Sequence, residues 1–113
     1  MVINTLNEDL FFIIEIDGDL DASSSIQLDT TLTKALSSNE KKIIVDCSRL
    51  NYISSAGLGV FMSYLQDFEA NNTQMVLFNV SDKVKNVFKV LGLDNLIKIV
   101  TDKKEAKGLL AQC

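Results

Sequence analysis

Two adjacent serines, Ser54 and Ser55, are the residues of this chain best placed for chemistry. They follow a β-branched apolar run at positions 43–45, which is typical of a buried strand. They precede a segment whose apolar residues recur at three- and four-residue steps, which predicts a helix. The serines therefore stand at the expected amino end of a helix, where unpaired backbone N–H groups favour hydroxyl and anionic oxygens.

Two glycines, Gly57 and Gly59, follow the serines in the first turns of that predicted helix. Each costs about 1 kcal/mol relative to alanine in a helix interior, so a helix selected only for stability would not carry both. They could leave the surface beside Ser55 nearly bare, so that a ligand or another protein approaches closely. Alternatively, they let the helix pack tightly on a strand while Ser54 or Ser55 simply caps it.

Several kinds of chemistry are excluded by what the sequence lacks. It has no histidine, so a Ser-His-Asp hydrolase is impossible, and residues 54–57 do not form a G-x-S-x-G elbow. Residues 57–62 lack the third glycine of a dinucleotide fingerprint, and there is no G-K-[ST] phosphate loop. We predict that the protein is not an enzyme and has no cofactor.

Four aspartates could in principle hold a hard cation: Asp17, Asp19, Asp21 and Asp46. Aspartates scattered at strand ends more often form caps and turns, so we predict no metal site. The net charge of −4 argues against a nucleic-acid partner, because phosphate contacts require a basic face. No apolar run approaches the length of a membrane span, and the amino end lacks a basic signal region.

The cysteines, Cys47 and Cys113, are far apart and lack metal-ligand spacing, so we expect two reduced thiols. Together with the missing signal region, they predict a cytoplasmic protein with no membrane partner.

Strands and helices are predicted to alternate in the order β-β-α-β-α-β-α-β-α. The strands are expected at 2–6, 10–16, 43–45, 75–80 and 97–100, with a turn at 17–19 and a polar connection at 46–54. The helices are expected to begin within 21–25, at 55, after the cap Ser81, and after Thr101 or Asp102, with Gly92 ending the third. This pattern predicts one α/β domain over residues 1–113, with a mostly parallel sheet and its first strand antiparallel.

The segment 45–61, V-D-C-S-R-L-N-Y-I-S-S-A-G-L-G-V-F, resembles the phosphorylation-site region of STAS domains, the anti-sigma factor antagonists (anti-anti-sigma factors) of bacteria. Their pattern ends in Asp-Ser-Ser/Thr-Gly-Leu-Gly-Val, and the phosphorylated serine lies two residues before the first glycine. The resemblance therefore implies phosphorylation of Ser55. Ser54 replaces the usual aspartate and is a second candidate acceptor, while Ala56 replaces the second hydroxyl residue.

A second match is Gly18-Asp19-Leu20-Asp21, which resembles the Gly-Glu/Asp-Leu-Asp motif at the entrance to the first helix of these domains. It implies that Asp21 lies near the phosphorylation site. The fold implied is the STAS fold, a mixed, mostly parallel sheet of four to five strands with about four helices. The implied docking surface comprises Asp19, Asp21, Ser54, Ser55, Ala56, Gly57, Leu58 and Gly59.

The resemblance implies a phosphorylation-controlled partner switch. The unphosphorylated antagonist binds an anti-sigma factor that is also a serine kinase, and thereby releases a sigma factor. Phosphorylation of Ser55 ends that binding, and a metal-dependent serine/threonine phosphatase restores it. The alternative is an accessory subunit of a transporter ATPase or of another signalling system without a sigma factor. Weak nucleotide binding by the domain itself is a third interpretation.

Overall fold

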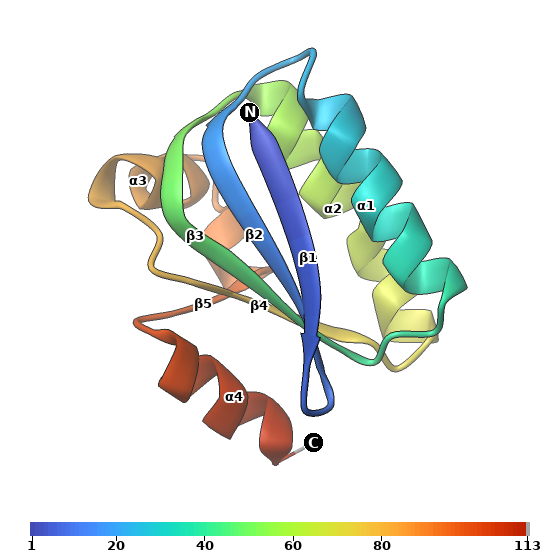
Figure 1. The fold of residues 1–113 in the computed structure, drawn as a ribbon. Coiled ribbons are helices and arrows are strands. Elements are labelled where there is room, and N and C mark those ends of the chain that lie inside the picture. Colours follow the sequence, from blue (N-terminus) through green and yellow to red (C-terminus); the bar gives the residue numbers. More distant parts are fainter. Residues whose placement is uncertain (113) are drawn as a thin grey trace.

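The computed structural model describes residues 1–112, which form a five-stranded sheet in the order β1-β2-β3-β4-β5 (Figure 1). Strand β1 is antiparallel to β2, and the remaining neighbours are parallel. The strands are β1 (Val2–Glu8), β2 (Phe11–Leu20), β3 (Lys42–Ile53), β4 (Gln74–Phe78) and β5 (Lys98–Val100). The helices are α1 (Ser25–Ser37), α2 (Ser55–Ala70), α3 (Asp82–Val90) and α4 (Lys103–Ala111), with a short 3₁₀ helix η1 (Leu93–Asn95). The predicted α/β class and mixed sheet are confirmed.

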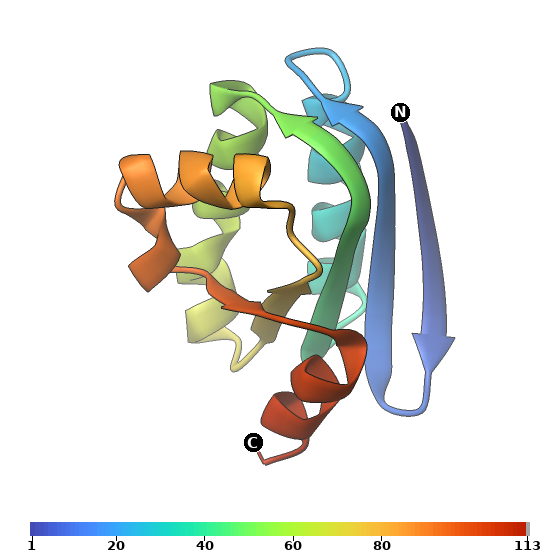
Figure 2. The same ribbon diagram turned by 90° about the vertical axis from the view of Figure 1, so that its left-hand side faces the viewer.

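The two faces of the sheet carry separate apolar cores. The larger core joins the sheet to α1, α2 and α3, with Leu28, Phe61 and Phe88 as contributions from the three helices. The smaller core joins the sheet to α4 through Ala106 and Leu110. Helix α4 lies at the end of the molecule opposite the starts of α1 and α2 (Figure 2). The starts of α1 and α2 therefore share one end of the sheet, away from α4.

Strands β2 and β3 are longer than the sequence predicted. The turn expected at 17–19 and the polar connection expected at 46–54 are wrong, because both segments continue the parallel pairing up to Leu20 and Ile53. The register shifts twice along this extension, and Gly18 adopts a φ of 115°. Each shift gives β3 one extra residue, so its buried residues Cys47, Leu50 and Ile53 are spaced by three instead of two.

The predicted helix boundaries are confirmed where polar caps mark them. Ser81 accepts a hydrogen bond from the N–H of Val84 (3.2 Å), and Asp102 accepts one from the N–H of Glu105 (2.8 Å). Gly92 has the expected left-handed conformation, with a φ of 72°. Leu10, which was expected to begin the second strand, instead lies in the two-residue turn between β1 and β2 and is 80% exposed.

Candidate functional site

Ser54 is the N-terminal cap of α2, and its hydroxyl group makes two hydrogen bonds. Its Oγ accepts from the N–H of Gly57 (3.2 Å) and donates to the carbonyl oxygen of Leu20 (3.0 Å). The N–H of Ser54 donates to the same carbonyl (2.9 Å). The capping alternative considered for the two serines therefore applies to Ser54. Its hydroxyl proton is already donated within the fold.

Ser55 is the first residue of α2, and its side chain is exposed. Within residues 1–112 no hydrogen bond of its hydroxyl group is found. The first turn of α2 contains no acidic residue, so no side-chain carboxylate of that turn offsets the positive end of the helix dipole. Ser55 thus presents a free hydroxyl to solvent at a position where a negatively charged group would be stabilised.

The two early glycines of α2 have different surroundings. Gly57 is buried, and a Cβ there would lie 2.8 Å from Cγ of Leu20 and 3.2 Å from Cγ1 of Ile53. Gly59 is exposed, with nothing within 4 Å of such an atom. Tight packing therefore explains Gly57, and only Gly59 leaves open surface. Gly57 and Leu58, which the resemblance places in the docking surface, are both buried, and Leu58 is only 2% exposed.

The end of β2 and the segment that leads to α1 contain the exposed residues Asp19 and Asp21. The carboxylate of Asp21 accepts hydrogen bonds from the N–H of Ser24 and from the hydroxyls of Ser24 and Ser23, each at 2.9 Å. These bonds, chiefly the one from the Ser24 N–H, lower the pKa of Asp21 to about 2. We call residues Asp19–Ser25 the acidic turn. Its carboxylate at Asp21 stays negatively charged at neutral and mildly acidic pH.

The acidic turn and the start of α2 are adjacent. Leu20, which lies within the turn, accepts both bonds from Ser54, so the residues on either side of Leu20 lie beside the serines. The two segments also occupy the same end of the molecule in the ribbon view (Figure 1). The structure thus brings together Asp19, Asp21, Ser54 and Ser55, with Ala56 also exposed. Leu20 joins the two segments, and although it belongs to the motif Gly18–Asp21, its apolar side chain did not mark it as a site residue in the sequence.

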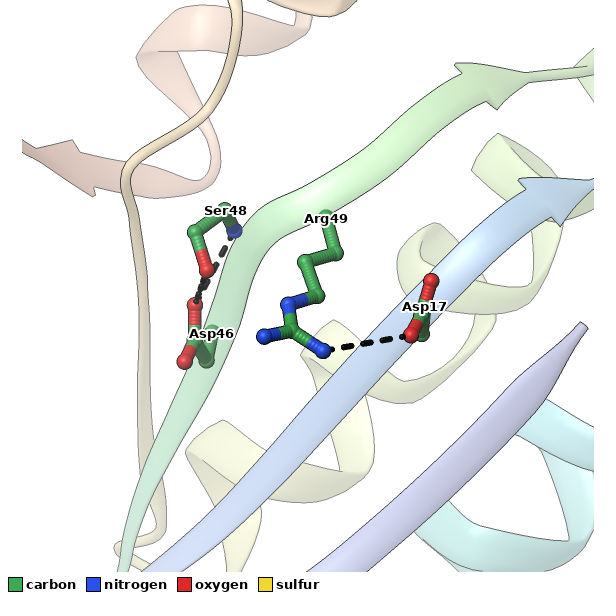
Figure 3. Close-up of polar contacts among 4 residues, drawn as sticks. All are labelled: Asp17, Asp46, Ser48 and Arg49. Carbon is green, nitrogen blue, oxygen red and sulfur yellow. Dashed lines mark hydrogen bonds and ion pairs between the residues drawn. The ribbon is translucent and has the colours of Figure 1, made fainter.

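The other aspartates considered as cation ligands lie on the sheet. Asp17 pairs with Arg49 at 3.6 Å, and Asp46 accepts hydrogen bonds from the N–H (3.0 Å) and hydroxyl (2.6 Å) of Ser48 (Figure 3). These four residues line a hollow of about 360 Å³. Among residues 1–112, no three His, Cys, Asp or Glu side chains are grouped as a metal site would require. Asp17 and Asp46 thus lie within β2 and β3 instead of in caps or turns, and each contacts a polar residue of β3.

Cys47 is a free thiol in the core, where burial raises its pKa well above the ordinary value and the Asp46 carboxylate adds to the shift. A thiol held protonated and away from solvent is a poor nucleophile. Cys113 lies outside the described residues.

Comparison with known proteins identifies the family. Residues 2–106 match the model of the STAS domain. The chain is 28% identical over 97 residues to the anti-sigma-B factor antagonist of Staphylococcus aureus, covering 86% of this chain and 90% of that protein.

Two solved structures show the same fold. One is an anti-sigma factor antagonist from Mycobacterium paratuberculosis (TM-score 0.88, 12% identity, 97% of this chain and 93% of that one). The other is the Bacillus cell fate determinant SpoIIAA in its phosphorylated form (TM-score 0.72, 21% identity, 96% and 99%). Within the described residues, no helix combines the length and apolar character needed to cross a bilayer. The match to the family model spans nearly all of the sheet and its helices, and the chain belongs to the STAS domain family.

Proposed function

We propose that this protein is an anti-sigma factor antagonist whose binding to its anti-sigma factor is controlled by phosphorylation of Ser55. The observation that carries the proposal is the contrast between the two serines. The Ser54 hydroxyl is held by Leu20 and Gly57, whereas the Ser55 hydroxyl is exposed and makes no hydrogen bond to any of residues 1–112. The name of the Staphylococcus aureus relative supports the same role.

The partners follow from this role. The unphosphorylated protein binds an anti-sigma factor that is a serine kinase, and the sigma factor held by that kinase is released. The kinase supplies ATP and magnesium and transfers phosphate to Ser55, and a metal-dependent serine/threonine phosphatase removes it. The protein itself performs no catalysis and acts in the cytoplasm, without nucleic acid or membrane as a partner.

The docking surface consists of the exposed residues at this end of the sheet. It comprises the acidic turn with Asp19 and Asp21, and the start of α2 with Ser55, Ala56 and Gly59, with Ser54 half-buried between them. Gly57 and Leu58 lie beneath it and shape it from within.

Phosphorylation acts by blocking this surface and leaves the fold intact. A phosphate at the start of α2 is stabilised by the helix dipole and the free N–H groups, so the helix does not melt. The phosphate adds nearly two negative charges and extra volume to a surface that must fit a partner. At about 7 Å and an effective dielectric of about 20, each pair of like charges costs roughly 2 kcal/mol before screening. A loss of about 10²-fold in affinity, about 3 kcal/mol, is therefore expected.

The site is tested by incubating the protein with its cognate kinase and ATP and mapping the modified residue by mass spectrometry. Phosphate is expected on Ser55 in the wild type, and none is expected in Ser55→Ala. Ser54→Ala should still be phosphorylated, because Ser54 is not the acceptor. Modification of Ser54 or of any other residue would contradict the assignment.

The role is tested by recovering the partner. The unphosphorylated protein should retain an anti-sigma kinase, and Ser55→Asp should bind that kinase about 10²-fold more weakly. Recovery of a transporter ATPase instead, with equal binding by Ser55→Asp, would favour the alternative role as an accessory subunit.

A further inference from the structure

Leu20 is the point at which the acidic turn and the start of α2 meet. Its carbonyl oxygen accepts two hydrogen bonds from Ser54, one from the N–H at 2.9 Å and one from the hydroxyl at 3.0 Å. Its side chain is fully buried against Gly57. A Cβ on Gly57 would lie only 2.8 Å from Cγ of Leu20. The end of β2 therefore contacts the first turn of α2 through both its backbone and its side chain.

The acidic turn is itself stiff. The N–H of Asp21 donates to Oγ of Ser24 (2.8 Å), and the N–H of Ser25 donates to the carbonyl of Asp21 (2.9 Å). The Ser24 hydroxyl lies 2.9 Å from both the Asp19 carbonyl and the Asp21 carboxylate, and its single proton serves one of them at a time. The Asp19 carbonyl and the Asp21 N–H of this network lie directly on either side of Leu20. Fixing the Leu20 carbonyl therefore stabilises these bonds, and releasing it lets the amides of the turn open more often.

We propose that Ser54 is a positioning residue whose hydroxyl holds the acidic turn against the start of α2, so that Asp19, Asp21 and Ser55 form one recognition surface of fixed shape. The hydroxyl can do this because it is both an acceptor for the helix N–H and a donor to the strand carbonyl. An ionised aspartate at this position could accept from Gly57 but has no proton to donate to Leu20. Capping and tethering are therefore separable by substitution.

The role of this surface in partner recognition rests on the proposed function, but the tether itself can be measured without a partner. Amide hydrogen exchange of Ser24 and Ser25, followed by NMR, reports the opening of the acidic turn. Ser54→Ala should exchange these amides about fivefold faster, the factor expected for one hydrogen bond. Ser54→Asp should also speed the exchange of Ser24 and Ser25, while the amide of Gly57 stays protected. Ser54→Thr should show the wild-type exchange rates.

Folding is preserved in these variants because the N–H of residue 54 still donates to Leu20. Ser81→Ala is the matched control, since Ser81 caps α3 with the same 3.2 Å hydrogen bond and makes no other side-chain hydrogen bond found within residues 1–112. It should leave Ser24 and Ser25 unchanged. Wild-type exchange in both Ser54→Ala and Ser54→Asp would overturn the tether, as would an equal effect of Ser81→Ala.

The consequence for recognition is read from steady-state kinetics with the cognate kinase. Ser54→Ala should raise the KM for this protein about fivefold with kcat within about twofold, because the surface is less often in its binding shape. Ser54→Thr, which keeps a hydroxyl group, should have the wild-type KM. An unchanged KM in Ser54→Ala would overturn the positioning role. If the kinase fails to modify even the wild type, the proposed function fails, and the exchange experiment still decides the tether.

Discussion

Helices α2 and α3 both begin with a serine cap, but only the cap of α2 also contacts a strand. In each helix a serine hydroxyl accepts from the N–H three residues later, at 3.2 Å for both Ser54 and Ser81. Ser81 is exposed, and its cap serves its own helix. Ser54 also donates to Leu20 on a neighbouring strand. A capping serine thus links its helix to a second element when its hydroxyl group donates a hydrogen bond as well as accepting one.

The third helical residue differs in a related way. In α3 it is Val84, whose side chain fills the core and is 1% exposed. In α2 it is Gly57, which has no side chain and lets the helix backbone rest on Leu20. The first turn of α2 can thereby lie closer to the sheet than a valine would allow, while the pairing of Leu20 with Ile53 places the Leu20 carbonyl opposite Ser54.

The largest effect is expected from giving α2 the valine that α3 has as its third residue. Gly57→Val should lower the free energy of unfolding by about 3 kcal/mol, because its Cβ and methyl groups would overlap Leu20 and Ile53. Denaturant unfolding measures the change. Gly59→Ala is the control: nothing obstructs its Cβ, and it should stabilise the protein by up to about 1 kcal/mol.

A second background sharpens this prediction. Leu20→Ala should itself cost about 3 kcal/mol, but it removes the two nearest atoms that Gly57→Ala would meet and leaves only Cγ1 of Ile53 at 3.2 Å. Gly57→Ala should therefore be destabilising in the wild type and neutral or stabilising beside Leu20→Ala. Equal effects in the two backgrounds would show that the contact with Leu20 does not explain the glycine.

The class of fold was predictable from the sequence because its helices carry regular apolar faces and clear caps, as at Ser81 and Asp102. The extensions of β2 and β3 were not, because two register shifts remove the two-residue alternation that marks a strand. The roles of Ser54 and Gly57 depended on those extensions. Only once β2 reaches Leu20 does a carbonyl stand opposite Ser54, and no local pattern around the serines encodes that contact.

A smaller effect should separate the two caps in stability. Ser81→Ala should cost about 1 kcal/mol, the usual loss for an N-terminal cap. Ser54→Ala should cost about 2 kcal/mol, because the bond to Leu20 is lost as well. Parallel denaturant titrations measure both. Equal losses in the two variants would mean that the hydrogen bond from the Ser54 hydroxyl to Leu20 contributes nothing to stability.

The first helical residue provides the next comparison. Helix α3 already carries an acid there, Asp82, whereas α2 carries Ser55. Ser55→Asp should therefore leave the melting temperature unchanged or raise it slightly, by no more than about 0.5 kcal/mol in stability, since the charge favours the helix dipole. Asp82→Ser should have an effect of similar size and opposite sign. A marked drop in melting temperature for Ser55→Asp would contradict the proposal that phosphorylation blocks a surface without unfolding the helix.

The smallest effect on stability is expected from the acidic turn, which lies beside the start of α2. The pKa of Asp21 falls from 3.8 to about 2 on folding, so its hydrogen bonds stabilise the fold fully above about pH 4 and are lost as the pH falls toward 2. Hydrogen bonds from Lys103 and Lys107 also lower the pKa of Glu8. Protonation of Glu8 at acidic pH therefore removes stability in the same direction as protonation of Asp21. Asp21→Asn keeps an acceptor that does not titrate, so between pH 4 and 2 its denaturation midpoint should fall less than that of the wild type. Identical slopes in the two proteins would mean that the turn is not held by the Asp21 carboxylate, and the tether at Ser54 would then hold a loop that is already loose.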